Sequence, residues 1–145
     1  MRPLFSRTKD RDRRPDGHGA GVRILLISRD EAFRDKWQRI FGNRGWGFES
    51  AATLENALVA LRARRAPVVV YDSQAAEEED WRDALSALGG LPQRPCVLLA
   101  SSVIDEGFRD EVVRLHGYDV LRRQADEDEI ARTINSAWFW KHRDA

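Results

Sequence analysis

The 145-residue chain has little cysteine: its single cysteine, Cys96, lies inside an apolar run. One cysteine excludes an internal disulfide framework and a zinc site built from cysteines. We interpret Cys96 as a small, buried hydrophobic side chain. The three histidines, His18, His116 and His142, lie far apart and lack the spacing of metal ligands. We therefore expect no metal centre made by these residue types.

Long apolar runs and an excess of one charge are also absent. No stretch approaches the roughly 18 residues that a membrane-spanning helix needs, and no signal-peptide core follows the amino terminus. The 24 basic residues equal the 24 acidic ones, so no global field indicates a membrane or nucleic-acid partner. The segment ILLISRDEAF after the first predicted strand lacks the glycines of a phosphate-binding loop. We expect a cytoplasmic protein that is not an enzyme.

The amino-terminal segment differs in composition from the rest of the chain. Residues 2–21 include six basic and three acidic side chains, two prolines and three glycines, but few apolar residues. Such a segment cannot bury enough surface to offset its ordering entropy. We therefore predict a disordered basic tail at residues 1–20 and one domain at residues 21–145. The tail is either a solvated extension or a weak arm for nucleic acid or an acidic partner, and nothing in the domain supports nucleic-acid binding.

From Val22 onward, short apolar runs alternate with segments of helical periodicity. In the first helical segment, Phe33, Trp37 and Phe41 recur at helical spacing behind Asp30, which is well placed as an N-cap. The predicted strands cover residues 22–27, 46–51, 68–71, 95–100 and 118–121. Five strands that alternate with five helices through short loops predict an α/β domain with a doubly wound parallel sheet.

Asp72 follows the most continuous of these apolar runs. Val68–Tyr71 is short, rich in β-branched residues and preceded by Pro67, as expected of a strand buried on both faces. Open parallel sheets place their ligands outside the carboxyl ends of the strands. Asp72 is therefore the first candidate for a functional residue, and a carboxylate that merely caps a loop is the alternative.

From about Val22 to Trp140 the chain resembles the receiver domain of bacterial two-component systems, the phosphoacceptor domain of response regulators. The resemblance depends on the order of elements, on Asp72 at the third strand's exit, and on the stretch GYDVLRRQADEDEI at residues 117–130. That stretch is similar to the family pattern G-A-x-D-x-L-x-K-P followed by an acidic helix start. The resemblance implies a flavodoxin-like sheet of five strands in the order 2-1-3-4-5.

In that family an acidic pair after the first strand holds a magnesium ion beside the phosphoacceptor aspartate. Here the pair falls on Ser28 and Arg29, whereas Asp72 is unchanged. Magnesium requires hard oxygen ligands in near-octahedral geometry, so we expect weak or absent binding and no cofactor. We further expect the Arg29 guanidinium to occupy the metal's place and pair with Asp72, with Arg123 approaching from the fifth strand. The alternative is that Arg29 points into solvent.

Other positions of the family's pocket are also replaced. The hydroxyl residue at the end of the fourth strand falls on Ala100, with Ser101 beside it as the alternative. The lysine after the fifth strand falls on Arg123, and the aromatic residue within that strand falls on Val120. The resemblance therefore implies a degenerate pocket, as in a pseudo-receiver.

Two functions follow from the resemblance. The first is a stand-alone receiver domain that acts through protein–protein interaction, independently of magnesium-dependent phosphorylation. The alternative is a conventional single-domain response regulator that a histidine kinase phosphorylates on Asp72. Expected partners are a histidine kinase, another response regulator or a second copy of the chain. Phe139 and Trp140 in the last helix, with Val120, are candidate partner contacts, and with five residues after Trp140 we expect no output domain.

Overall fold

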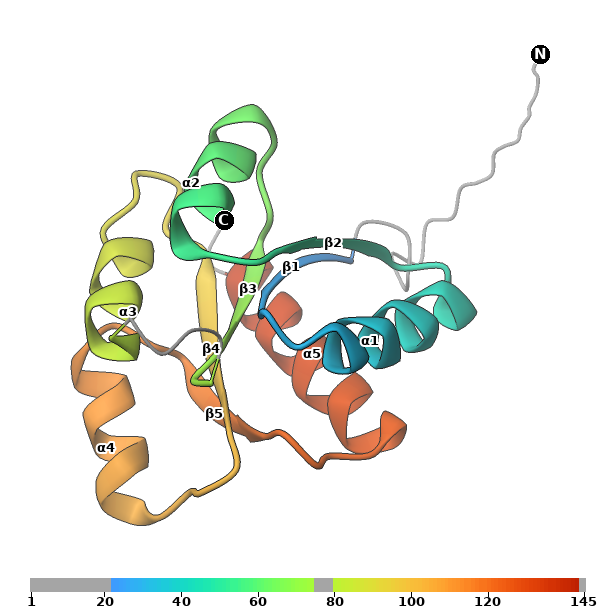
Figure 1. The fold of residues 1–145 in the computed structure, drawn as a ribbon. Helices are drawn as coiled ribbons and strands as arrows, with labels where there is room; N and C mark the ends of the chain where they lie inside the picture. Colours follow the sequence, from blue (N-terminus) through green and yellow to red (C-terminus); the bar gives the residue numbers. More distant parts are fainter. Residues whose placement is uncertain (1–21, 75–79, 144–145) are drawn as a thin grey trace.

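A five-stranded parallel sheet forms the centre of the protein, in the order β2-β1-β3-β4-β5. The structure is a computed structural model that describes residues 22–74 and 80–143. Strands and helices alternate along the chain, and Figure 1 shows the helices on both faces of the sheet. The predicted flavodoxin-like fold and strand order are confirmed. The predicted tail at residues 1–20 and most of the acidic loop at 77–80 lie outside the described residues.

The strands are short, and the three central ones are almost entirely apolar and buried. All five residues of β3 and all six of β4 are buried, as expected for strands covered on both faces. The strand bounds are β1 Arg23–Ile27, β2 Gly47–Ala51, β3 Val68–Asp72, β4 Cys96–Ser101 and β5 Asp119–Arg122.

The helices begin at polar caps, as the sequence indicates. Asp30 accepts a hydrogen bond from the Phe33 amide at the start of the first helix, and Thr53 accepts one from the Asn56 amide at the start of the second. Gly45 ends the first helix at φ 70°, a left-handed conformation that glycine adopts without penalty. The helix bounds are α1 Glu31–Arg44, α2 Leu54–Ala63, α3 Trp81–Gly89, α4 Glu106–Arg114 and α5 Glu127–Arg143.

Two apolar layers cover the two faces of the sheet. Helices α1 and α5 close one face, where Trp37 and Ile134 are buried against the strands. Helices α2, α3 and α4 close the other face, with Leu61, Leu85 and Val112 at its centre. Both layers pack on the same strands, so the sheet that positions the carboxyl edge is covered on both faces.

Some predicted bounds differ from the structure by one to three residues. β3 continues through Asp72 and β4 through Ser101, because both residues still pair with neighbouring strands. α4 ends at Arg114, before Gly117, because His116 turns into the left-handed region at φ 74°. Among the described residues, none of the helices has the length and hydrophobicity to cross a membrane.

Candidate functional site at the carboxyl edge of the sheet

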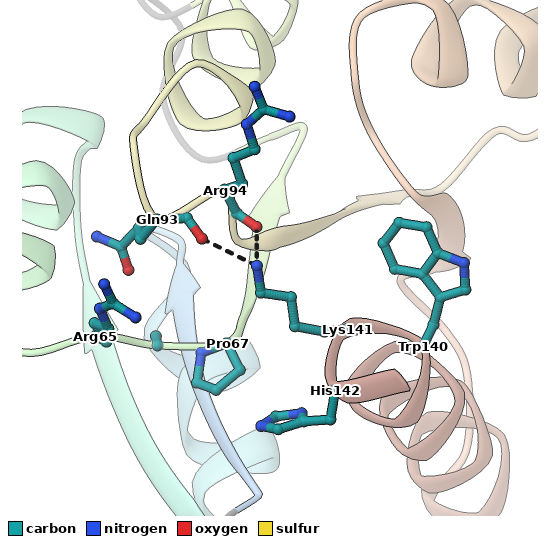
Figure 2. A pocket seen from close by; sticks show the side chains of 8 residues that line it. Arg65, Pro67, Gln93, Arg94, Trp140, Lys141 and His142 are labelled. Carbon is teal, nitrogen blue, oxygen red and sulfur yellow. Dashed lines mark hydrogen bonds between the residues drawn. The ribbon is translucent and has the colours of Figure 1, made fainter. Parts of the chain in front are cut away.

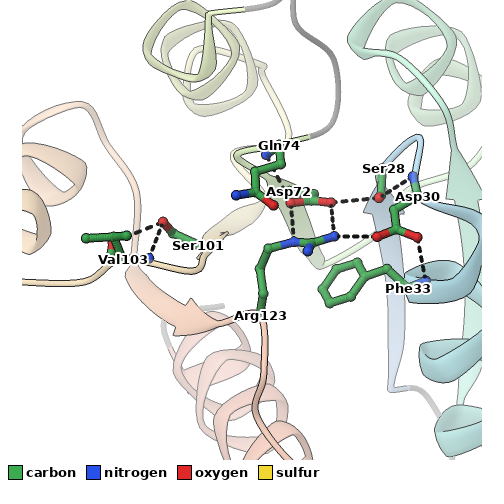
Figure 3. Close-up of polar contacts among 8 residues, drawn as sticks. All are labelled: Ser28, Asp30, Phe33, Asp72, Gln74, Ser101, Val103 and Arg123. Carbon is green, nitrogen blue, oxygen red and sulfur yellow. Dashed lines mark hydrogen bonds and ion pairs between the residues drawn. The ribbon is translucent and has the colours of Figure 1, made fainter.

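The site lies where β1, β3, β4 and β5 end, and Asp72 stands at its centre. Asp72 is the last residue of β3 and its backbone pairs with Ala100 of β4. Ser28 directly follows β1, and Arg123 directly follows β5. In Figure 3 both side chains point toward Asp72, from different directions. Asp72 and Ser28 are 0% exposed, so the Asp72 carboxylate is completely shielded from solvent.

The Asp72 carboxylate accepts four hydrogen bonds, two on each oxygen. Oδ1 accepts from the Gln74 amide at 3.0 Å and from Nε of Arg123 at 2.9 Å. Oδ2 accepts from the Ser28 hydroxyl at 2.8 Å and from Nη2 of Arg123 at 3.0 Å. A carboxylate has about four acceptor positions in total. The hydrogen-bonding capacity of Asp72 is therefore filled by groups of the chain itself.

Arg123 is the central cation of the site. Its guanidinium binds Asp72 through two nitrogens and also donates from Nη2 to Oδ2 of Asp30 at 2.9 Å. It lies over the Phe33 ring, 4.4 Å from the ring centroid, in a cation–π contact. Burial opposes the charge, but the hydrogen bonds to Asp72 and Asp30 outweigh this and raise the pKa of Arg123 above its ordinary value. The two carboxylates therefore stabilise the charged form of the guanidinium.

Asp30 has two roles at this edge. One carboxylate oxygen caps α1 through the Phe33 amide, and the other binds Arg123. The hydrogen bond from Arg123, followed by that from the Phe33 amide, lowers the pKa of Asp30 below its ordinary value. Ser28 is held in turn, because its hydroxyl accepts from the Asp30 amide at 3.0 Å while it donates to Asp72. Asp30, Ser28, Asp72 and Arg123 thus form one connected network.

The expected pairing of Arg29 with Asp72 is wrong in this structure. Arg29 is exposed, and the cation beside Asp72 is Arg123. Ser28 takes the inward position after β1, so the next side chain, Arg29, leaves the pocket. The sequence indicates Asp30 as a helix cap alone and does not reveal its part in the ion-pair network. The signal that could have found it is its place as the third residue after β1, at the same edge of the sheet as Arg123.

The two candidate hydroxyl positions contribute no donor to the pocket. Ala100 is fully buried beside Asp72 and has no hydroxyl group. The Ser101 hydroxyl is engaged in its own loop, where it donates to the Val103 carbonyl at 3.0 Å and accepts from the Val103 amide at 3.2 Å. Figure 3 shows this pair separated from the contacts of Asp72. Of the two positions, Ala100 is the one beside Asp72.

The candidate partner contacts lie on a different part of the molecule. Phe139 is 64% exposed, and Trp140 is 41% exposed with its ring against Tyr118 at a centroid distance of 5.2 Å. The expectation for Val120 needs correction. Its side chain is 6% exposed and packs in the layer under α2, α3 and α4, so it presents almost no surface to a partner.

The residues present do not suit a magnesium ion. Among residues 22–74 and 80–143, no group of three or more His, Cys, Asp and Glu side chains gathers where it could hold a metal. Within the described part of the chain, Asp72 and Asp30 are the two carboxylates that bind Arg123 at the site, and the Arg123 guanidinium lies between them. A divalent cation would have to displace a fixed positive charge and break a bidentate ion pair.

Solved structures with this fold include receiver domains of response regulators. No protein-family model and no curated protein sequence matches the chain. A signal receiver domain of an HD domain-containing protein from Pseudomonas fluorescens Pf-5 superimposes with a TM-score of 0.75, at 17% identity, over 84% of this chain and 90% of that one. The beryllofluoride-activated NtrC4 receiver domain, a dimer, gives 0.75 at 17% identity, over 83% and 98%. Chemotaxis response regulator CheY4 of Vibrio cholerae gives 0.73 at 14% identity, over 80% and 98%.

Proposed function

We propose that the chain is a receiver-like signalling domain, a pseudo-receiver, that acts by binding other proteins and does not use magnesium-dependent phosphorylation of Asp72. The observation that carries the proposal is the state of the Asp72 carboxylate. It is fully buried, and Ser28, Gln74 and Arg123 fill its hydrogen-bonding positions.

The chemistry of phosphoryl transfer supports this proposal. An aspartate that attacks a phosphoryl group needs an accessible oxygen, a divalent ion to offset the negative charge, and donors for the transferred oxygens. Both oxygens of Asp72 are engaged by Arg123, so attack would require the loss of a buried ion pair. Ser28 and Arg29 replace the carboxylates that would hold the ion, and Ala100 replaces the hydroxyl donor.

The expected partners are signalling proteins, namely a histidine kinase or another response regulator, and a second copy of this chain is a further candidate. The exposed Phe139 on α5 supports an association surface on this helix, because large exposed aromatic side chains often anchor protein interfaces. Trp140 is next to it and is partly covered by Tyr118. The dimeric state of the NtrC4 receiver domain is consistent with self-association of this fold.

The second candidate function is that of a conventional response regulator phosphorylated on Asp72 by a histidine kinase. The position of Asp72 at the end of β3, with the basic Arg123 after β5, favours it. In this case Arg123 would have to release Asp72 and then contact the phosphoryl group.

Backbone-amide NMR during titration with magnesium, and then with beryllofluoride as a phosphoryl mimic, separates the two functions. We expect the amides of Ser28, Asp72 and Ala100 to remain unshifted at millimolar magnesium, because Arg123 occupies the place of the ion. Shifts that saturate at these residues would contradict the proposal and would favour the conventional regulator.

The double variant Ser28→Asp with Arg123→Lys provides the positive control. It supplies a carboxylate after β1 and replaces the bidentate guanidinium with a single ammonium group. We expect its pocket amides to shift at millimolar magnesium in the same experiment. Its spectrum without magnesium first establishes that the variant is folded.

A further inference from the structure

The amino edge of the sheet, opposite to Asp72, has three neighbouring hollows. The largest, about 700 Å³, lies between the α2–β3 loop, the α3–β4 loop and the end of α5. It shares Arg65 with a hollow of about 370 Å³ and shares Arg94 and Trp140 with one of about 620 Å³. The shared residues show that the three hollows adjoin one another in a row, and we call this row of hollows the amino-edge groove.

Cationic side chains line the groove. Among the described residues that line the three hollows, five are Arg or Lys and none is Asp or Glu. The positively charged residues come from three separate segments. They are Arg62 in the last turn of α2 with Arg64 and Arg65 after it, Arg94 before β4, and Lys141 near the end of α5. This separation explains why the sequence alone gave no indication of a basic surface within the domain.

Several of these cations are available to a ligand. Arg62, Arg64, Arg65 and Arg94 are exposed, and none of their guanidinium groups forms an ion pair with another residue in the described part of the chain. Other exposed arginines do form such pairs, as Arg122 does with Glu129. Adjacent like charges without a counter-ion repel one another, which raises the free energy of the unbound protein. An anion bound in the groove would reduce this repulsion.

The backbone at Arg94 is held in an unusual conformation. Arg94 has φ 48°, a left-handed value that a glycine or asparagine would adopt at lower cost. Lys141 links the turn at Gln93 and Arg94 to α5 by two hydrogen bonds. Its Nζ donates to the Gln93 carbonyl at 3.0 Å and to the Arg94 carbonyl at 2.7 Å. Figure 2 shows both hydrogen bonds at the centre of the groove, with Trp140 on the opposite side from Arg65. Arg94 therefore lines two of the hollows at the cost of backbone strain.

We propose that the amino-edge groove binds single-stranded nucleic acid through its phosphates, with a base stacked on Trp140. Arginine binds phosphate oxygens in pairs, and a row of cations with an exposed aromatic ring is the arrangement that holds single strands without sequence preference. The Trp140 ring is 41% exposed and is supported from behind by Tyr118. The extension of the groove over three hollows favours a strand of several nucleotides over a single nucleotide.

The test is the fluorescence anisotropy of a labelled 20-nucleotide oligothymidine with the full chain, at several salt concentrations. The double variant Arg65→Gln with Arg94→Gln should weaken binding by about tenfold or more and flatten the slope of log affinity against log salt by about one unit. The matched control is Arg39→Gln with Arg132→Gln, which removes the same charge from exposed positions outside the groove. It should change the affinity by less than about twofold.

Trp140→Leu tests the stacking contact separately. It should weaken binding by about tenfold and leave the salt slope unchanged, because no phosphate contact is lost. Circular dichroism of each variant shows whether it is folded.

Three results would overturn the proposal. The first is an equal loss of affinity in the groove variant and the matched control. It would show that binding depends on the net charge of the protein or on its amino-terminal segment. The second is displacement of the oligonucleotide by a single thymidine nucleotide at equal phosphate concentration, which would indicate a mononucleotide site. The third is tighter binding of a polyglutamate peptide than of the oligonucleotide, which would indicate an acidic protein partner. None of these results bears on the proposed role of Asp72.

Discussion

Arg123 joins two carboxylates of very different exposure, and this difference decides which contact matters for stability. The Asp72 side chain is 0% exposed and that of Arg123 is 16% exposed, so this pair is buried. The Asp30 side chain is 43% exposed, so its pair with Arg123 is largely screened by solvent. A buried ion pair adds little to stability when compared with apolar residues of the same size. The loss of one partner is nevertheless strongly destabilising, because it leaves an unpaired buried charge.

We therefore expect Arg123→Met to lower the free energy of unfolding by about 3–5 kcal/mol. Adding Asp72→Asn to this variant should recover most of the loss, because the buried charge is then removed. Arg122→Met is the matched control and should cost less than about 1 kcal/mol, since Arg122 pairs with Glu129 at the surface. Urea denaturation measures all three variants. A cost for Arg123→Met equal to that of the control would show that Asp72 keeps its hydrogen bonds without the cation.

The Asp30 carboxylate adds a pH dependence to this network. Because its pKa is lowered in the folded protein, the contribution of Asp30 is complete above the ordinary value of 3.8 and is lost as the pH falls through the lower folded value. Near neutral pH the full contribution of Asp30 is therefore present, and small changes of pH there should not alter stability through this carboxylate.

At the residue scale the sequence predicted the position of Asp72 and the approach of Arg123, but it assigned the direct ion pair to Arg29. The carboxyl end of β3 could be predicted because Val68–Tyr71 is continuously apolar. Whether Arg29 or Arg123 pairs with Asp72 could not be predicted from the sequence, because it depends on which side chain after β1 points inward. Ser28 is small enough to fill that place, and Arg123 reaches Asp72 along the Phe33 ring from the neighbouring loop.

At the element scale, caps and apolar periodicity made the helices predictable, whereas their ends depend on tertiary contacts. The end of α4 is an example. The backbone of Gly117 packs against the end of α4, where its amide donates a hydrogen bond to the Val112 carbonyl at 2.9 Å. A Cβ atom on Gly117 would lie 2.5 Å from Cγ1 of Val112 and 3.0 Å from the Val112 carbonyl oxygen. No local pattern in the sequence shows that this approach is so close.

Gly117→Ala should therefore lower the free energy of unfolding by about 1–3 kcal/mol, because the backbone of the α4–β5 turn must move. Gly42→Ala is the matched control within α1. A Cβ atom there would meet nothing within 4 Å, and alanine is a better helix former than glycine. We expect it to stabilise the protein by up to about 1 kcal/mol in the same thermal or urea denaturation. A neutral Gly117→Ala would show that the turn adjusts freely.

At the scale of the whole molecule, both apolar layers depend on the same five strands. Residues of β3 alternate between the layers, since Val68 and Val70 belong to the α1–α5 layer and Val69 and Tyr71 to the other. Neither layer can separate from the sheet without exposing the central strands. This arrangement predicts a single cooperative unfolding transition.

Cys96 offers a probe of that transition. It is 3% exposed, and burial raises the pKa of its thiol to about 12 from an ordinary 9.0. Since the thiolate is the reactive form, we expect Ellman's reagent at pH 8 to react at least about a hundredfold more slowly with the folded chain than with the urea-unfolded chain. The rate should rise in parallel with loss of the circular dichroism signal. Rapid reaction without loss of that signal would reveal local opening at the start of β4.

The internal cation at Asp72 has a consequence for how such a protein could be regulated. If the proposed function holds, the positive charge of the pocket is supplied by an amino acid when the chain is translated, and neither a kinase, a phosphatase nor the magnesium level would change it. The strength of the signal would then depend on the number of copies in the cell. Control then passes to synthesis and degradation, so the response would follow dosage and would persist for the lifetime of the protein.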